Sequence, residues 1–255
     1  MQLSEDIALR KRNILVKICY DGKRYHGWQI QKNALSIQEV FQEALYNVLS
    51  EKPDIKGCSR TDAFVHANEY CINFPTSHTI PCERLVAALN RHLPKDIAVT
   101  HSSEVPADFH ARYSCKGKEY IYKIWNSPIR NPFLEGYAFH YWYPLDVALL
   151  NAAAEHYIGR HDFTSFCTTD QRERINMVRN VTSFSVKRSG DLVTMSVEAD
   201  GFLYNMVRIL VGTLLRVAQK KISPSDIPKI IAAKNRNMAG PTAQPCGLYL
   251  NRVYY

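Results

Sequence analysis

Residues 58–67 read CSRTDAFVHA and form the stretch around which the rest of the chain is best understood. Two runs that favour β-strands flank them, Pro53–Gly57 before and Glu69–Phe74 after. The loop between these runs holds four polar side chains: Arg60, Thr61, Asp62 and His66. A loop carried between strands commonly presents binding or catalytic groups, although Asp and Thr are also ordinary turn residues. The stretch therefore predicts either a functional Asp62 or a plain turn.

The composition predicts an ordered protein of one large or two small domains. The chain has 255 residues, 46% of them hydrophobic, which is enough for a sizeable core. Its formal charge of +8 is uneven, since residues 1–105 hold 13 Lys and Arg against 12 Asp and Glu, whereas residues 106–255 hold 19 against 12. Such a basic balance indicates either a polyanionic partner such as nucleic acid or a solvated surface without a partner.

The sequence lacks the patterns of a membrane span, a metal site or a disulfide framework. Its seven cysteines are scattered without a C-x-x-C pair, and its histidines show no metalloenzyme spacing. Cys58 has no histidine partner at close spacing, so we expect it to be a buried apolar residue. The polar stretch Met1–Asn13 lacks the apolar core of a signal peptide. We expect a cytoplasmic protein that works without a metal or a nucleotide cofactor.

Hydrophobic periodicity divides the chain into two halves that each combine strands and helices, residues 1–105 and 106–255. The first half has the order βαββαβ, as in a ferredoxin-like unit. Besides the strands that flank the loop, its predicted elements are Asn13–Tyr20, Ser36–Leu49, Pro81–Arg91 and Asp96–His101. The second half has a similar order. Its predicted elements are Lys118–Asn126, Asp146–Tyr157, a hairpin of Val178–Ser189 with Leu192–Ala199, Tyr204–Gln219, Ile227–Ala233 and Leu248–Tyr254.

The predicted helix Tyr204–Gln219 is apolar on all sides and is expected to be buried. Arg208 lies early in it, and a buried guanidinium requires an anion because it does not lose its charge. Asp62 is a plausible partner, because an aspartate beside Arg stays ionised, as a nucleophile must. The alternative is that Arg208 reaches solvent near the first turn. Gly212, four residues on, is expected to leave open space above the Arg208 side chain.

Two other segments carry aromatic or titratable side chains. Residues Tyr25–Gln29 either line a site or pack a loop onto the core, which is the commoner fate of Trp and Tyr. His161 and Asp162 are adjacent on a predicted strand and point to opposite faces, so they are not expected to act as a catalytic dyad. The polar loop beyond them reaches the charged stretch Gln171–Arg174.

In several places, and in the same order along the chain, the sequence resembles the tRNA pseudouridine synthase A family. The motif Arg60-Thr61-Asp62-Ala63 followed by Val65-His66-Ala67 is similar to the family signature R-T-D-A-G-V-H-A. Further similar motifs lie in Tyr20–Gln29, Asp108–Arg112 with Tyr120–Tyr122, His161–Phe166, Asn205–Leu214 and Gly247–Leu250. Together these motifs cover most of the chain and are highly specific.

The resemblance implies roles for four residues. Asp62 becomes the catalytic nucleophile, and Arg208 its ion-pair partner. Tyr120 becomes the aromatic side chain that stacks on the target base, and Arg60 helps to hold or flip the nucleotide. The implied activity is the isomerisation of uridine to pseudouridine in the anticodon stem-loop of tRNA, at family positions 38, 39 and 40. It needs no cofactor.

The resemblance also implies an α+β pseudouridine synthase fold. In that fold two ferredoxin-like halves form an extended antiparallel sheet flanked by helices, with the active-site cleft between the halves. The family works as a homodimer on tRNA. The half formed by residues 1–105 would carry the Asp62 loop, and the more basic half formed by residues 106–255 would carry Tyr120 and Arg208.

The loop departs from the family signature at two positions. Phe64 stands where the signature has its glycine, and Ser59 stands where the family usually has another. Phe does not adopt a positive φ cheaply, so either the position does not need one or the loop is reshaped. These departures motivate a second hypothesis, a non-catalytic RNA-binding homologue. A metal-dependent nuclease is poorly supported, because ligand clusters are missing from the sequence.

Overall fold

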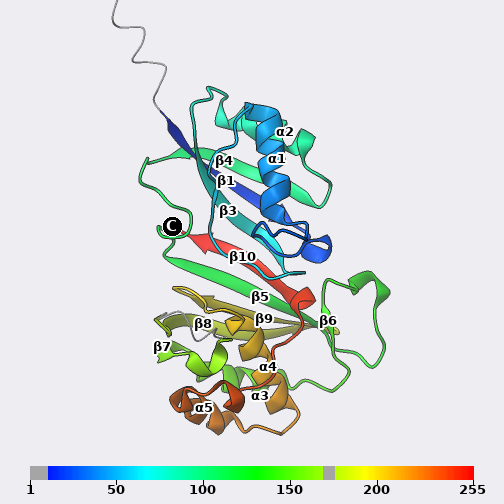
Figure 1. Cartoon of the computed structure of the whole chain (residues 1–255). Helices are drawn as coiled ribbons and strands as arrows, with labels where there is room; N and C mark the ends of the chain where they lie inside the picture. The colour runs from blue at the N-terminus through cyan, green and yellow to red at the C-terminus, as the bar shows by residue number, and fades with distance from the viewer. Residues whose placement is uncertain (1–10, 169–175) are drawn as a thin grey trace, which may run out of the picture. The chain divides into compact units, whose positions relative to one another are not determined.

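A computed structural model describes residues 11–168 and 176–255, which fall into two units (Figure 1). The first unit contains the chain up to Cys115 together with Leu250–Tyr255, and the second contains Lys116–Tyr249. The division into residues 1–105 and 106–255 stays a prediction. The charged stretch Gln171–Arg174 and most of the N-terminal stretch Met1–Asn13 lie outside the described residues.

The first unit has the predicted order of strands and helices. Its elements are β1 (Arg12–Tyr20), α1 (Ile37–Leu49), β2 (Lys56–Gly57), β3 (His66–Thr76), α2 (Cys82–His92) and β4 (Ile97–Val105). Helix α1 begins after Ser36, whose Oγ accepts a hydrogen bond from the Glu39 N–H at 3.3 Å. This bond satisfies one of the N–H groups that a helix N-terminus leaves without an intrahelical partner.

Strand β1 lies between β3 and β4 in the sheet of the first unit and pairs antiparallel with both. Val16 is opposite Ile72 on one side and Ser102 on the other. On the far side of β3 the strand order continues into β10 (Leu248–Tyr254), whose residues from Leu250 onward belong to this unit. Helices α1 and α2 lie side by side along this sheet (Figure 1). The loop between β2 and β3 is therefore carried by a packed two-layer scaffold.

The second unit again combines a sheet with helices. Its elements are β5 (Gly117–Trp125), β6 (Phe139–His140), α3 (Val147–Glu155), β7 (Gly159–Asp162), β8 (Val178–Ser189), β9 (Leu192–Ala199), α4 (Met206–Ala218) and α5 (Ile227–Ala233). Strands β5, β9, β8 and β7 are neighbours in that order, and all three pairings are antiparallel. Helix α3 packs against both β8 and α4. Ten residues of α4 are buried, as its sequence predicts.

Short 3₁₀ helices complete the connections in the described parts of the chain. They are Gly22–Arg24, Pro132–Leu134, Thr164–Phe166, Pro224–Asp226, Arg236–Met238 and Pro245–Gly247.

One strand pairing corrects the expectation of a wholly antiparallel arrangement. Strand β6 runs parallel to β5, with Ile124 opposite Phe139 and Trp125 opposite His140. Parallel neighbours need a crossover connection of about a dozen residues, which the chain between Trp125 and Phe139 supplies. The protein is thus an α+β protein whose strands pair in a mixed rather than a purely antiparallel manner.

Candidate active site

The loop between β2 and β3 is held in place by backbone hydrogen bonds on both sides of Asp62. The Trp28 N–H donates to the Thr61 carbonyl at 3.2 Å, and the Phe64 N–H donates to the Tyr25 carbonyl at 3.1 Å. The hydroxyl of Tyr20 lies 2.9 Å from Thr61 Oγ1, and both side chains are buried. Asp62 itself is half-buried. The backbone that carries its carboxylate is therefore fixed by hydrogen bonds at the residue before it and at the second residue after it.

The segment Tyr25–Gln29 supports the loop through its packing. Tyr25 and Trp28 are 2% and 4% exposed, which confirms the packing interpretation of these aromatic residues. The Trp28 ring stacks on Tyr70 with centroids 4.4 Å apart, and the Tyr70 hydroxyl donates to the Ser59 carbonyl. A Cβ at Gly57 would lie 2.3 Å from the Tyr70 hydroxyl oxygen, so glycine is required there. This aromatic layer fixes the start of the loop.

Tyr25 also has a defined protonation state. Its hydroxyl donates to Asp96 Oδ1 at 2.7 Å. Burial, followed by the hydrogen bond to Asp96, raises the pKa of Tyr25 above its ordinary value. The phenol therefore remains a hydrogen-bond donor that ties the segment before Trp28 to Asp96, the residue directly before β4.

His66 supports the loop from its other end. It is 1% exposed at the start of β3, and its Nδ1 accepts the Gly22 N–H at 3.1 Å. Asp21 Oδ1 lies 3.2 Å from the same nitrogen. His66 thus fastens the turn after β1 onto β3. The histidine of the signature has a structural role in the described chain.

Phe64 adopts a left-handed backbone conformation at the position where the family signature has a glycine. Its φ is +65°, and it is the third residue of a turn closed by the Val65 N–H on the Asp62 carbonyl at 3.3 Å. A positive φ at this turn position favours glycine. The position therefore needs the unusual backbone, and the chain adopts it with a phenylalanine. The ring is 43% exposed, and its centroid lies 5.9 Å from the His26 ring.

The remaining loop residues follow their predicted environments. Arg60 is exposed, so its guanidinium is available to a polyanion. Cys58 is completely buried, and its Sγ accepts the Cys71 N–H at 3.4 Å. A thiol in this setting packs as an apolar side chain.

Tyr120 lies on β5 in the second unit, opposite Val197 on β9. Phe202 contacts its ring edge-on, with the centroids 5.0 Å apart and the planes at 82°. Only 6% of Tyr120 is exposed. The edge-on contact fixes the plane of the ring, although stacking on a base requires that more of one face become accessible.

Arg208 is half-buried on the first turn of α4, and neutral oxygens fix its orientation. Its Nε donates to the Ala243 carbonyl at 2.8 Å, and its Nη1 donates to Asn205 Oδ1 at 2.9 Å. The Ala243 N–H in turn donates to the Arg208 carbonyl at 3.0 Å. These contacts were not predicted, although Asn205 belongs to a motif quoted above.

The open space expected above Arg208 is absent. A Cβ at Gly212 would lie 1.7 Å from the Pro241 carbonyl oxygen, because residues 240–244 cross α4 at backbone contact. We call residues 240–244 the strap. The Gln244 carbonyl of the strap accepts a hydrogen bond from the Tyr122 hydroxyl at 2.7 Å. Burial raises the pKa of Tyr122 well above its ordinary value. Gly212 is therefore small because the strap replaces a side chain there, which corrects the prediction.

The four predicted site residues are distributed over the two units. Asp62 and Arg60 share the loop of the first unit, and Tyr120 and Arg208 belong to the second. The ion pair between Asp62 and Arg208 stays a prediction. On β7, His161 Nε2 lies 2.9 Å from the Ile158 carbonyl, while Asp162 accepts the Thr164 N–H at 3.0 Å. The two adjacent residues thus have separate partners.

The described residues contain neither a metal-binding cluster nor a membrane-spanning helix. Among residues 11–168 and 176–255, no three His, Cys, Asp or Glu side chains are grouped so as to hold a metal ion. Within the same ranges, no helix combines the length and the apolar character needed to cross a bilayer.

Comparison with known proteins agrees with the motifs. A family model described as tRNA pseudouridine synthase matches residues 18–114 and 153–255. A Thermoanaerobacter sp. (strain X514) protein named tRNA pseudouridine synthase A is 43% identical over 244 residues, which is 96% of this chain and 100% of the relative. The proteins of that name from Acetivibrio thermocellus and Ruminiclostridium cellulolyticum are each 45% identical, with the same shares covered.

Among solved structures, the chain aligns with one described as an unknown protein from Galdieria sulphuraria. The identity is 13%, the alignment covers 84% of this chain and 94% of that one, and the TM-score of 0.22 is too low to support an argument. The family model and the relatives together span nearly the whole chain. The chain therefore belongs to the tRNA pseudouridine synthase A family.

Proposed function

We propose that this chain isomerises uridine in the anticodon stem-loop of tRNA, at positions 38, 39 and 40, with Asp62 as the covalent nucleophile. Family membership carries the activity itself, that of a tRNA pseudouridine synthase, an isomerase. The observation that carries the assignment of Asp62 is its backbone, which is fixed on both sides through Thr61 and Phe64. A nucleophile held in this way meets its substrate without first ordering a loop.

The reaction suits a single carboxylate. Pseudouridine has the same atoms as uridine, so the glycosidic N1–C bond breaks, the base turns, and a bond forms through C5 instead. The proton leaves C5, and N1 gains one. A carboxylate that attacks and later leaves serves both halves of such a reaction. Hydrolysis of a glycoside would instead call for two carboxylates at a defined separation.

The other three residues are proposed to handle the nucleotide. Arg208 keeps the Asp62 carboxylate ionised in the substrate complex, and its orientation is fixed by Ala243 and Asn205. Tyr120 stacks on the target base after the base leaves the helical stack. Arg60, exposed on the loop, contacts the flipped nucleotide through its phosphate. The proposal places the catalytic groups on two ferredoxin-like halves of a pseudouridine synthase fold.

The family resemblance further supports tRNA as partner, a homodimer as the working form and the cytoplasm as the location. The excess of basic residues in the second half supports the first of these. Sedimentation of the purified protein tests the homodimer, since a monomer at the concentration used for catalysis would contradict it.

Replacement of Asp62 by Asn tests the mechanism directly. The variant keeps the shape of the side chain but loses the negative charge, so we expect no pseudouridine in the tRNA and an unchanged tRNA Kd and melting temperature. The matched control is Asp54→Asn, since Asp54 is an exposed aspartate of the same unit paired with Lys56. Wild-type product formation by Asp62→Asn would refute the role of Asp62. Binding of tRNA without product by the wild type would instead favour the non-catalytic homologue.

A further inference from the structure

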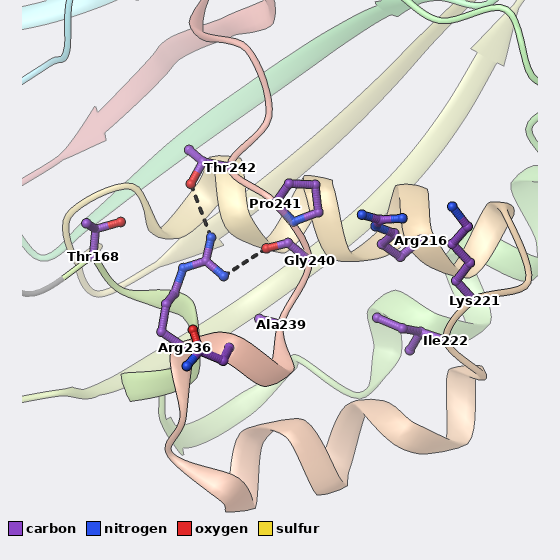
Figure 2. Close-up of a pocket in the computed structure, with 10 residues that line it drawn as sticks. Thr168, Arg216, Lys221, Ile222, Arg236, Ala239, Gly240, Pro241 and Thr242 are labelled. Atoms are coloured by element: carbon purple, nitrogen blue, oxygen red, sulfur yellow. Dashed lines mark hydrogen bonds between the residues drawn. The ribbon is translucent and has the colours of Figure 1, made fainter.

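The second unit contains a cationic hollow, by which we mean the cavity of about 650 Å³ beside the end of α4 (Figure 2). Three cations line it, Arg216, Lys221 and Arg236, and among the described residues that line it there is no Asp or Glu. Neutral donors, including Thr168 and Asn237, complete its wall. Neither Tyr120 nor Arg208 lines the cavity, so it is separate from the residues proposed above for this unit.

The three cations reach the hollow from two different segments. Arg216 lies in the last turn of α4, and the Lys221 N–H donates to its carbonyl at 3.0 Å, which holds the two side by side. Arg236 comes from the 3₁₀ helix before the strap. The dipole of α4 favours cations at its C-terminal end, which accounts for the position of Arg216 and Lys221. It does not account for Arg236.

Arg236 is held in place by two neutral oxygens. Its Nη1 donates to the Gly240 carbonyl at 2.9 Å, and its Nη2 donates to Thr242 Oγ1 at 3.2 Å (Figure 2). Burial lowers the pKa of the Arg236 guanidinium. Within residues 11–168 and 176–255, none of the three cations forms an ion pair with a carboxylate. Clustered cations without carboxylates focus a positive potential on the cavity.

A second, mostly apolar cavity of about 310 Å³ adjoins the cationic hollow. The two share Arg216, Lys221 and strap residues Pro241 and Thr242, and Tyr141 is among the residues that line the second. A positively charged cavity beside an apolar one with an aromatic wall matches the two parts of a nucleotide, its phosphate and its sugar and base.

We propose that the cationic hollow binds a phosphate group of the tRNA backbone, with the attached nucleoside against the adjoining apolar cavity. The proposal rests on the proposed function, since it assigns a further contact to the same substrate. Arg, Lys, Thr and Asn side chains are the usual donors to RNA phosphates, and all four residue types line the hollow. This contact fixes the tRNA and takes no part in the chemistry at the target uridine.

The test is tRNA binding by the double variant Arg216→Gln with Lys221→Gln. Arg236 is left intact because it supports the strap. The control is Lys187→Gln with Lys229→Gln, which removes the same charge from exposed lysines that do not line the hollow. Binding is measured by fluorescence anisotropy of labelled tRNA at several salt concentrations, and melting curves confirm that both variants fold. We expect the tRNA Kd of the double variant to rise on the order of tenfold. We also expect the slope of log Kd against log salt concentration to become shallower, by the equivalent of about one to two phosphate contacts.

Turnover separates this contact from catalysis. For the double variant we expect the KM for tRNA to rise while kcat at saturating tRNA equals that of the control. A Kd and a salt dependence equal to those of the control would overturn the proposal. The proposal would also be overturned if the double variant lost its binding of adenosine monophosphate but kept the tRNA affinity of the control. That result would assign the hollow to a free nucleotide. Failure of the proposed function appears differently, as absence of pseudouridine with the wild-type protein whatever its affinity for tRNA.

Discussion

The backbone N–H of Phe64 donates to the carbonyl of Tyr25 at 3.1 Å while Phe64 holds a φ of +65°. The hydrogen bond fixes the loop beside Asp62, and the left-handed conformation costs an L-amino acid about 1–2 kcal/mol. The family signature avoids this cost with a glycine. Here the scaffold holds the strained residue, as commonly happens next to functional groups.

The strain at Phe64 predicts an order among its substitutions. Phe64→Val and Phe64→Asn both remove the ring, but a β-branched residue tolerates positive φ worst and Asn tolerates it well. We expect the free energy of unfolding of the Val variant to be lower than that of the Asn variant by about 1 kcal/mol. Urea denaturation measures it, as the difference between the two midpoints multiplied by the denaturant slope m. Equal midpoints would show that the loop relaxes away from the positive φ.

The sequence predicts the elements best where the pattern is local. Strands β8 and β9 match their predicted bounds residue for residue. The reason is that the turn residues Gly190 and Asp191 mark where one alternating run ends and the next begins. Strand β2 is shorter than predicted, Lys56–Gly57 instead of Pro53–Gly57. Pro53 has no N–H to give to a neighbouring strand, so the start of that run does not pair.

The site was predictable only in part, for a related reason. The position of Asp62 between two strands follows from neighbouring residues, whereas the support of Arg208 by Ala243 joins residues 35 positions apart. No local period indicates that the strap lies on α4, so Gly212 was interpreted as open space. The positive φ of Phe64 was likewise hidden, because the residue type argues against it.

Tyr120 tests the proposed stacking on the target base. Tyr120→Phe keeps the ring and its edge-on contact with Phe202, so we expect kcat/KM within a few-fold of wild type. Tyr120→Leu removes the aromatic face, and loss of one stacked base is worth about 1–3 kcal/mol, or roughly 5- to 150-fold in kcat/KM. Both variants are assayed for pseudouridine formation after their melting temperatures are compared. Equal activity of the two variants would exclude stacking as the role of Tyr120.

Asp162 gives a prediction about pH and stability. Burial raises its pKa, but hydrogen bonds from Thr164 and Lys234 outweigh burial, so the pKa in the folded protein lies below its ordinary value. A depressed carboxyl pKa adds stability above the unfolded-state pKa, near 4, and this stability is lost as the pH falls through the folded-state pKa. We expect Asp162→Asn to lower the urea midpoint at pH 7, and we expect the gap to the wild type to narrow as the pH falls below the unfolded-state pKa. A gap that stays constant with pH would contradict the ionised state of Asp162.

Gly212 tests whether the strap positions Arg208. Alanine at this position places a Cβ 1.7 Å from the Pro241 carbonyl oxygen, so the strap has to move and the bond from Arg208 Nε to the Ala243 carbonyl is lost. Overpacking of this kind costs about 1–3 kcal/mol of stability. The control for stability is Gly201→Ala, since the nearest atom to a Cβ there is a flexible Arg179 side chain at 3.4 Å.

The catalytic effect of Gly212→Ala separates positioning from packing. If Arg208 acts from the orientation that the strap gives it, kcat falls at least tenfold at a temperature where the variant is fully folded, while the tRNA Kd stays within about threefold. A purely structural role lowers the melting temperature and leaves kcat unchanged below it. Because Ala243 contributes through its backbone carbonyl, Ala243→Ser keeps the acceptor and is expected to retain wild-type kcat. Loss of kcat in both variants would show that the strap acts by another route than Arg208.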